Sequence, residues 1–537
     1  MLESGLTFSK KEQYIPNKYG TRGFIDLVAH DAKGRLVLIE VKRTKSAERE
    51  AVHEILKYIE GAKRHLGLKE DEVRVFVVSP DWTELFVPFS SLVHRTNCSV
   101  TGFKLDVSEN GDVLAASEVE PLRWSGDRLI APWHELRYYI EEDTSNAAIS
   151  KYESANKEKG IESFVILELH PTDGLEGGIA SPKQSTMWDM LSTMSGPTKT
   201  KSELPKYKRA LYFAMQQLSE EEYLSILKSS KSDISETLEV LEGMEEEEER
   251  LNTLHEAILD MKPRPECDFL EIGYPAKIAS RLLQDDGWKV HKIHRFGTFE
   301  RNTILLNDQT IIDEVCGQDG AGYQQYTKKF DPKNKTEVAA VERGIDHCLS
   351  ENLAWRKQTK EALREIVEMS GTTSVEFKLY NPSTALLTFY LAVSRDDGQK
   401  YIPGYSYFRR TVDKEILVFG CLRWDGSKAN LETVLRKHYD SSVSAMLFPL
   451  NWGGYDAQDS QVMRTIGFRY RTFKIEILGE IRDFFEMTEE GWEECDEIHP
   501  LQDFQRVYEE HESLMRDICD LYAEKWSGGA IDLSGMS

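Results

Sequence analysis

The stretch GFIDLVAHDAKGRLVLIEVK, residues 23–42, decides the fold of the first part of this 537-residue chain. Two runs within it, 24–29 (FIDLVA) and 36–41 (LVLIEV), are apolar and rich in β-branched residues, which favours strands. The tetrapeptide DAKG at 31–34 has the composition of a tight turn, so the stretch predicts a β-hairpin. Four consecutive apolar residues at 36–39 indicate that the second strand is buried on both faces.

Three charged residues interrupt this apolar pattern. Asp26 stands inside the first strand, where a carboxylate is costly unless it is paired or binds a metal. Glu40 and Lys42 stand two residues apart at the end of the second strand, so they project from one face. If the strands pair, the carboxylates of Asp26 and Glu40 converge into a site suited to Mg²⁺ or Mn²⁺. Lys42 would then orient the attacking water or hold a phosphate.

The residues that follow predict a mixed sheet flanked by helices. Apolar residues recur at helical spacing from about 46 to 66, and residues 73–78 (VRVFVV) predict a buried strand. A second helix is expected to start at Pro80-Asp81, and a last strand near 99–105.

The hairpin with its motif, Gly23-Phe-Ile-Asp26-Leu and then Ile39-Glu40-Val41-Lys42, resembles the PD-(D/E)XK nucleases. It is closest to their RecB-like and NucS-like branch. The resemblance covers residues 1–107 and implies a restriction-endonuclease-like fold with Mg²⁺- or Mn²⁺-dependent hydrolysis of phosphodiester bonds. It also implies that Asp26, Glu40 and Lys42 are catalytic and that the backbone carbonyl of Val41 ligates the metal.

Three further residues become candidates through this resemblance. Glu3 lies in a short leading element where the family carries an acidic residue, so it is an auxiliary candidate. Glu54 replaces the family's usual Gln, four residues before Tyr58, and the two share a helix face. Glu54 is therefore a further catalytic candidate and Tyr58 an auxiliary one.

The charge of the chain is unevenly distributed. The net charge is -25, yet residues 1–100 contain 16 Lys and Arg against 14 Asp and Glu, a net of +2. This favours a nucleic-acid-facing N-terminal part joined to an acidic body. Basic residues around the motif are candidates for phosphate contact or ordinary surface charge: Lys18, Arg22, Arg43, Lys45 and Arg49.

Beyond residue 107 the sequence predicts a linker or small α+β subdomain at 108–206, a mainly helical middle segment at 207–262, and a large α+β C-terminal region at 263–537 that would act as a sensor or bind a partner. Expected long helices lie near 336–369 and 503–526. Strands are expected at 163–169, 373–379, 385–393, 415–421 and 444–449.

Composition excludes several other classes of protein. The seven cysteines show no zinc-knuckle spacing, so reduced cysteines in a cytoplasmic protein are expected. No apolar run has the length of a signal peptide or a membrane span, so no membrane association is expected.

Two weaker patterns stand in the C-terminal half. His291 and His294 could be half of a metal site, but spacing supplies no partner and a polar pair at a strand end is favoured. The aromatic residues Tyr401, Tyr405, Tyr407 and Phe408 precede Arg409 and Arg410 and could stack nucleic-acid bases, although strand packing is favoured.

The leading hypothesis is an Mg²⁺-dependent DNA endonuclease regulated by its C-terminal region, in antiviral defence or DNA repair. A homo-oligomer or a regulatory protein partner fits the large remainder of the chain. Two alternatives stay open: a non-cleaving nucleic-acid-binding or assembly protein, and a nuclease that acts on RNA.

Overall fold

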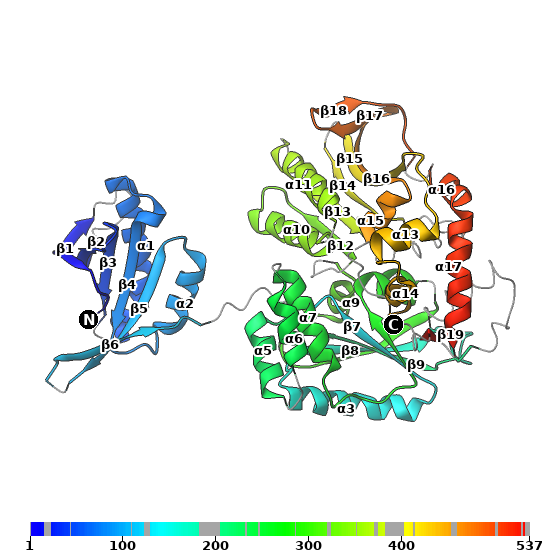
Figure 1. Ribbon diagram of the computed structural model, residues 1–537. Coiled ribbons are helices and arrows are strands. Elements are labelled where there is room, and N and C mark those ends of the chain that lie inside the picture. The colour runs from blue at the N-terminus through cyan, green and yellow to red at the C-terminus, as the bar shows by residue number, and fades with distance from the viewer. Residues whose placement is uncertain are drawn as a thin grey trace. The chain divides into compact units, whose positions relative to one another are not determined.

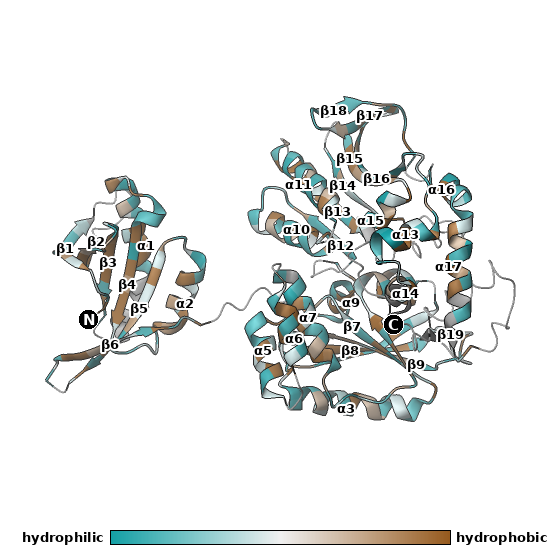
Figure 2. Ribbon diagram, in the orientation of Figure 1, coloured by the Kyte–Doolittle hydropathy of each residue, from teal (hydrophilic) through white to brown (hydrophobic). Residues whose placement is uncertain are grey.

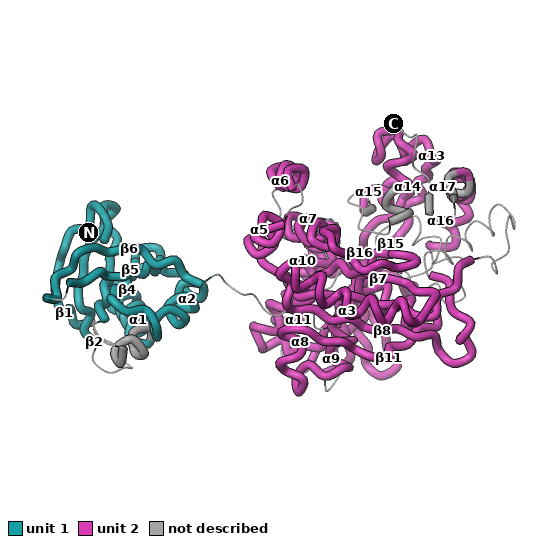
Figure 3. The backbone as a smooth tube through the Cα atoms, turned by 90° about the horizontal axis from the view of Figure 1, so that it is seen from below, with its two compact units in different colours: residues 1–127 teal, residues 128–537 magenta. Residues whose placement is uncertain are grey.

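The structure is a computed structural model with two compact units, residues 1–127 and 128–537, each described by itself (Figures 1 and 3). It describes residues 2–15, 23–42, 45–108, 110–122, 129–181, 204–230, 234–244, 247–284, 286–318, 324–350, 352–369, 374–381, 402–411, 414–452, 459–499, 503–527 and 530–531. Within these ranges, none of the helices combines the length and apolar character that crossing a membrane requires.

The first unit contains a mixed sheet with strand order β1-β2-β3-β4-β5-β6. The pairs β3–β4 and β4–β5 are parallel, and the other neighbours are antiparallel. The strands are β1 (Thr7–Ile15), β2 (Gly23–His30), β3 (Leu36–Val41), β4 (Val73–Ser79), β5 (Ser99–Val107) and β6 (Val113–Val119). The expected hairpin and mixed sheet are therefore present, and strands β3 and β4 are strongly apolar (Figure 2).

Two helices cover one face of this sheet, α1 (Lys45–Leu66) and α2 (Phe86–Arg95). Ile55 and Ile59 of α1 and Phe89 of α2 pack in one buried cluster with Leu38 and Val77 of the strands. The opposite face has its own small core, built from strand residues such as Val37 and Phe76 with Leu2 and Leu6 packed against it. A short 3-10 turn, η1 (Glu70–Glu72), leads into β4.

The first unit departs from the sequence prediction at three places. Strand β1 was not expected, and β6 carries the sheet past residue 107, where the domain was expected to end. Helix α2 begins at Phe86 instead of Pro80-Asp81. Asp81 accepts hydrogen bonds from the backbone and hydroxyl of Thr83 and so forms a turn before the helix.

The second unit begins with an antiparallel sheet of order β10-β7-β9-β8-β11. Its strands are β7 (His134–Tyr139), β8 (Phe164–Pro171), β9 (Arg209–Met215), β10 (Phe269–Gly273) and β11 (Trp288–Arg295). The strand expected at 163–169 is β8. The expected ranges 108–206, 207–262 and 263–537 all supply strands to this one sheet, because its neighbours pair across those boundaries.

Helices cover both faces of this sheet (Figure 1). One face carries α3 (Glu142–Lys159), α5 (Glu220–Ser229), α6 (Ser235–Glu242) and α7 (Glu247–Asp260), which supply the helices expected in the middle of the chain. The other carries the π-helical turn η3 (Lys277–Leu282), α8 (Thr298–Arg301) and α9 (Asp308–Val315).

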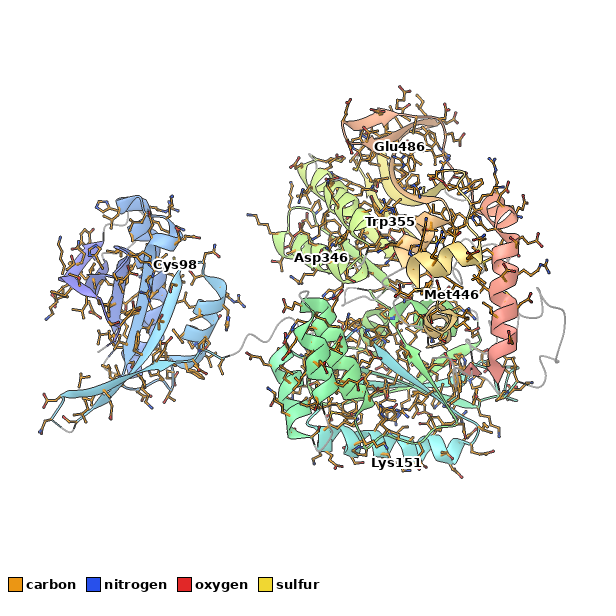
Figure 4. The ribbon with its side chains drawn as sticks, in the orientation of Figure 1. Cys98, Lys151, Asp346, Trp355, Met446 and Glu486 are labelled. Carbon is orange, nitrogen blue, oxygen red and sulfur yellow. The ribbon has the colours of Figure 1, made fainter. Side chains whose placement is uncertain are left out.

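A second antiparallel sheet follows, with its strands in chain order. They are β12 (Gln325–Phe330), β13 (Val375–Tyr380), β14 (Gly404–Arg410), β15 (Glu415–Trp424), β16 (Phe468–Leu478), β17 (Ile481–Thr488) and β18 (Gly491–Glu494). Helices α10 (Lys335–Cys348) and α11 (Leu353–Glu368) pack on it. Trp355 of α11, labelled in Figure 4, is fully buried against Tyr405 and Tyr470.

The C-terminal helices form a further core with the end of this sheet. They are α13 (Leu431–His438), α14 (Val443–Trp452), α15 (Asp459–Thr465), α16 (Phe504–Glu510) and α17 (Glu512–Lys525). The short pair β19 (Trp526–Ser527) and β20 (Ala530–Ile531) ends the described chain.

Several expectations for this region need correction. The strand expected at 444–449 is the helix α14, since a short apolar run does not by itself distinguish strand from helix. The expected helices 336–369 and 503–526 are each two helices, divided between Cys348 and Leu353 and at His511. The expected strand 385–393 lies outside the described residues. Tyr405 and Tyr407 are buried in β14, which confirms strand packing for these two residues, whereas Tyr401 lies outside the described residues.

Candidate active site

Strands β2 and β3 bring Asp26 and Glu40 together. Leu27 lies opposite Ile39 in the antiparallel register, and continuing that register by one residue sets Asp26 opposite Glu40. Both side chains therefore lie on the face that α1 covers. The Asp26 carboxylate accepts a hydrogen bond from the backbone N–H of Val41 through its Oδ2 atom, at 2.8 Å.

Lys42 joins this carboxylate pair to the helix. Its Nζ atom lies 2.8 Å from Oε1 of Glu40 and also donates a hydrogen bond to Glu54 of α1. The Lys42 backbone N–H donates to the carbonyl of Val78 at 2.8 Å, which extends the parallel pairing with β4 to this residue. The structure thus brings four sequence candidates into one cluster: Asp26, Glu40, Lys42 and Glu54.

Burial perturbs the ionisation of this cluster. Burial of Glu40, which is only 3% exposed, raises the pKa of its carboxyl to about 7. Lys42 opposes this shift, while the charges of Asp26 and Glu54 add to it. For Lys42, burial lowers the pKa, but its hydrogen bonds to Glu40 and Glu54 outweigh burial and the net pKa is raised. Lys42 therefore stays positively charged at neutral pH.

The cluster has the donors that a hard divalent cation requires. The Oε2 atom of Glu40 is buried and has no hydrogen-bond partner among the described residues. A buried oxygen without a partner is costly, and a metal ion would satisfy it. The three carboxylates, when ionised, outnumber the single ammonium by two charges. An all-oxygen donor set with this excess negative charge fits Mg²⁺ or Mn²⁺.

Tyr58 connects helix α1 to the hairpin of β2 and β3 through a hydrogen bond. Its hydroxyl donates a hydrogen bond to the backbone carbonyl of Phe24, at 2.9 Å. Burial raises the pKa of this hydroxyl, and the charges of Glu40, Glu54 and Asp26 raise it further. Tyr58 is therefore a neutral donor that holds α1, and with it Glu54, against β2.

The structure places Glu3 away from this cluster. Its carboxylate receives two hydrogen bonds from Arg74 of β4, at 2.8 and 2.7 Å, and Arg74 also contacts Asp31 at 3.2 Å. Arg74 alternates with Val73 and Val75, which belong to the core beneath α1, so it faces the other side of the sheet. Arg74 was not among the residues predicted from the sequence, although a lone arginine inside a buried strand signals a required partner.

The remaining candidates are the basic residues for which phosphate contact and ordinary surface charge are alternatives. Lys18, Arg22 and Arg43 lie outside the described residues. Lys45 and Arg49 belong to α1, but their side chains are also outside the described part of the structure.

A mixed sheet backed by two helices, with paired carboxylates and a lysine at the end of its hairpin, characterises the PD-(D/E)XK class of nuclease domain. Residues 1–86 match the family model of the endonuclease NucS C-terminal domain, a PD-(D/E)XK-related nuclease family. The match includes all four residues of the cluster and indicates a nuclease or endonuclease-related, DNA-binding function for the N-terminal part. Comparison with curated proteins and with solved structures found no match to the chain.

Proposed function

We propose that the N-terminal unit is a divalent-metal-dependent nuclease that hydrolyses phosphodiester bonds in DNA. The observation that supports this most strongly is the buried Oε2 atom of Glu40 beside Asp26 and Lys42, which has no hydrogen-bond partner in the part of the chain that the structure describes. Burying an unsatisfied carboxylate oxygen destabilises the fold, and a bound cation would remove this cost.

Asp26, Glu40 and the backbone carbonyl of Val41 would hold Mg²⁺ or Mn²⁺. When bound, the cation supplies an acidified water and neutralises charge on the phosphate. The ammonium of Lys42 is fixed by two carboxylates, so it can stabilise the negative charge that develops on the phosphate without first reorienting. Glu54 acts by positioning Lys42 and by adding negative charge to the cation site.

DNA is proposed as the substrate because the matching family is an endonuclease family. The second unit is proposed to regulate cleavage, since it holds most of the chain and a net charge of -23 (49 Lys and Arg against 72 Asp and Glu) out of -25. An acidic body disfavours nonspecific contact with nucleic acid, which suits a nuclease that acts only on a signal. Roles in antiviral defence or DNA repair would use such control.

The test is cleavage of supercoiled, linear and single-stranded DNA and of RNA by the full chain, with Mg²⁺, Mn²⁺ or EDTA. Metal-dependent cutting of DNA that disappears in Glu40→Gln is the expected result. Cutting of RNA alone would mean that the substrate is RNA and not DNA. Absence of cutting, together with metal-independent binding to DNA, would favour the binding or assembly protein instead.

A further inference from the structure

A second group of metal-binding side chains lies in the other unit, where β8 pairs with β11 at the edge of the first sheet. Their antiparallel register shifts between Val290 and Lys292, so His291 is the extra residue of a β-bulge. A bulge points a side chain in a direction that it would not take in a regular strand. His291 is exposed at this edge.

The bulge sets His291 beside two residues of the neighbouring strand. Glu168 and His170 are two residues apart on β8 and face the same side. The rings of His170 and His291 stack, with centroids 3.9 Å apart and an angle of 12° between their planes. Nε2 of His170 lies 2.7 Å from Oε1 of Glu168.

A third histidine completes the group. His294 lies opposite Ile166, which places it on the face that also carries Glu168. Its Nε2 atom lies 3.3 Å from Oε2 of Glu168, so both carboxylate oxygens have a histidine neighbour. Each oxygen of the Glu168 carboxylate therefore lies near one imidazole, Oε1 near His170 of β8 and Oε2 near His294 of β11.

The spacing of the ligand atoms suits a small cation. One ligand atom from each of Glu168, His170 and His291 lies within 4.8 Å of the others. Tetrahedral zinc with bonds of about 2.0–2.2 Å keeps its ligands roughly 3.3 Å apart, so modest side-chain rotations would close the site. Imidazole nitrogens with one carboxylate are the donors that Zn²⁺ and its neighbours prefer, whereas Mg²⁺ prefers oxygen.

The positive charge of Arg209 opposes a cation here, although Arg209 pairs with Glu142 at 3.0 Å.

We propose that Glu168, His170, His291 and His294 form a site for a transition-metal cation of the Zn²⁺ type. Three of these side chains group their ligand atoms, and His294 lies beside the second oxygen of Glu168, so a cation bound here would join the edge strand β11 to β8. This site differs in ligand chemistry from the all-oxygen cluster of the N-terminal unit. The inference does not depend on the proposed nuclease activity.

The test uses the full chain carrying Glu40→Gln, which removes the contribution of the N-terminal cluster. Zn²⁺ binding is measured by competition with a chromogenic chelator, and Co²⁺ binding by the visible absorption of four-coordinate cobalt. The variant is His291→Asn with His294→Gln. The control is His65→Asn, an exposed histidine of the first unit.

The expected result is that the control keeps the Zn²⁺ equivalent and the cobalt absorption, and that the double variant loses both. Zn²⁺ should raise the melting temperature of the control and not that of the variant, because a cation that binds only folded protein stabilises it. Equal binding by variant and control would overturn the proposal. If the double variant does not fold, Glu168→Gln, which keeps hydrogen-bonding atoms, takes its place under the same criteria.

Discussion

Oε1 of Glu40 and Nζ of Lys42 lie 2.8 Å apart at the end of β3, and both side chains are almost excluded from solvent. The other oxygen of the same carboxylate, Oε2, has no partner within the described structure. In the proposed function this carboxylate has two roles: Oε1 fixes the lysine, and Oε2 would bind the cation.

Replacing Lys42 with Met should lower DNA cleavage by at least about 10²-fold, the usual cost of removing one group that stabilises transition-state charge. The matched control is Lys104→Met, because Lys104 is an exposed lysine of the same sheet. Initial rates at saturating Mg²⁺ measure the effect. A rate within threefold of the control (roughly 0.7 kcal/mol) would show that Lys42 is only a structural partner.

Glu54→Gln should keep the hydrogen bond to Lys42 while removing one negative charge from the cluster. We therefore expect a near-normal rate at saturating Mg²⁺, with several-fold more Mg²⁺ needed to reach half of it. Glu54→Leu removes the acceptor as well and should also lower the saturated rate. Mg²⁺ titrations of the three proteins separate these effects, and identical curves for all of them would exclude a role for Glu54.

Without divalent metal, Glu40 should make local stability fall as pH rises. Its pKa is about 7 in the folded chain and near 4.5 when the chain is unfolded, so the folded state binds the extra proton between these values. As the pH rises from about 4.5 to about 7, the backbone amides of the wild-type protein should become less protected from hydrogen exchange relative to those of Glu40→Gln. Above about pH 7 the difference should stay constant. Hydrogen exchange of peptides spanning β3, in EDTA, measures this difference.

The same ionisation should control metal affinity. Mg²⁺ needs the ionised carboxylate, so its apparent affinity should rise about tenfold per pH unit below the pKa of Glu40 and flatten above about 7. Calorimetric titrations at several pH values measure the trend. A flat affinity across this window would mean that Glu40 does not bind the cation.

Glu3→Gln should leave the cleavage rate unchanged within about twofold (roughly 0.4 kcal/mol). Its carboxylate pairs with Arg74 on the sheet face opposite to the cluster, and the partly exposed pair contributes about 1 kcal/mol or less to stability. Parallel assays of cleavage and thermal unfolding check both statements. A large loss of activity without unfolding would mean that Glu3 acts in catalysis.

Sequence reasoning located the hairpin, the mixed sheet and the helix that follows, because buried strands and amphipathic helices have strong periodic patterns. It did not find β1 or β6, most of whose side chains are exposed or half-buried. Such edge strands lack the apolar signal. The placement of Glu3 could not be predicted either. The sheet face on which it lies depends on its pairing with Arg74, which is 71 residues away along the chain.

The histidine cluster shows the same limit more clearly. His291 and His294 were noticed in the sequence, but spacing offered no partner for them. Glu168 lies 126 residues before His294, and only the pairing of β8 with β11 brings them together. Local patterns report elements well, whereas a site assembled from distant strands requires knowledge of which strands are neighbours.

The bulge at His291 has a consequence for how this site can arise or vanish in evolution. Lys292 lies opposite Glu168 and His294 lies opposite Ile166, so the strand pairing does not require His291. Deleting its single codon would leave a regular ladder with every other residue in its present partnership. One in-frame insertion or deletion is therefore enough to add or remove a ligand without disturbing the sheet that carries it.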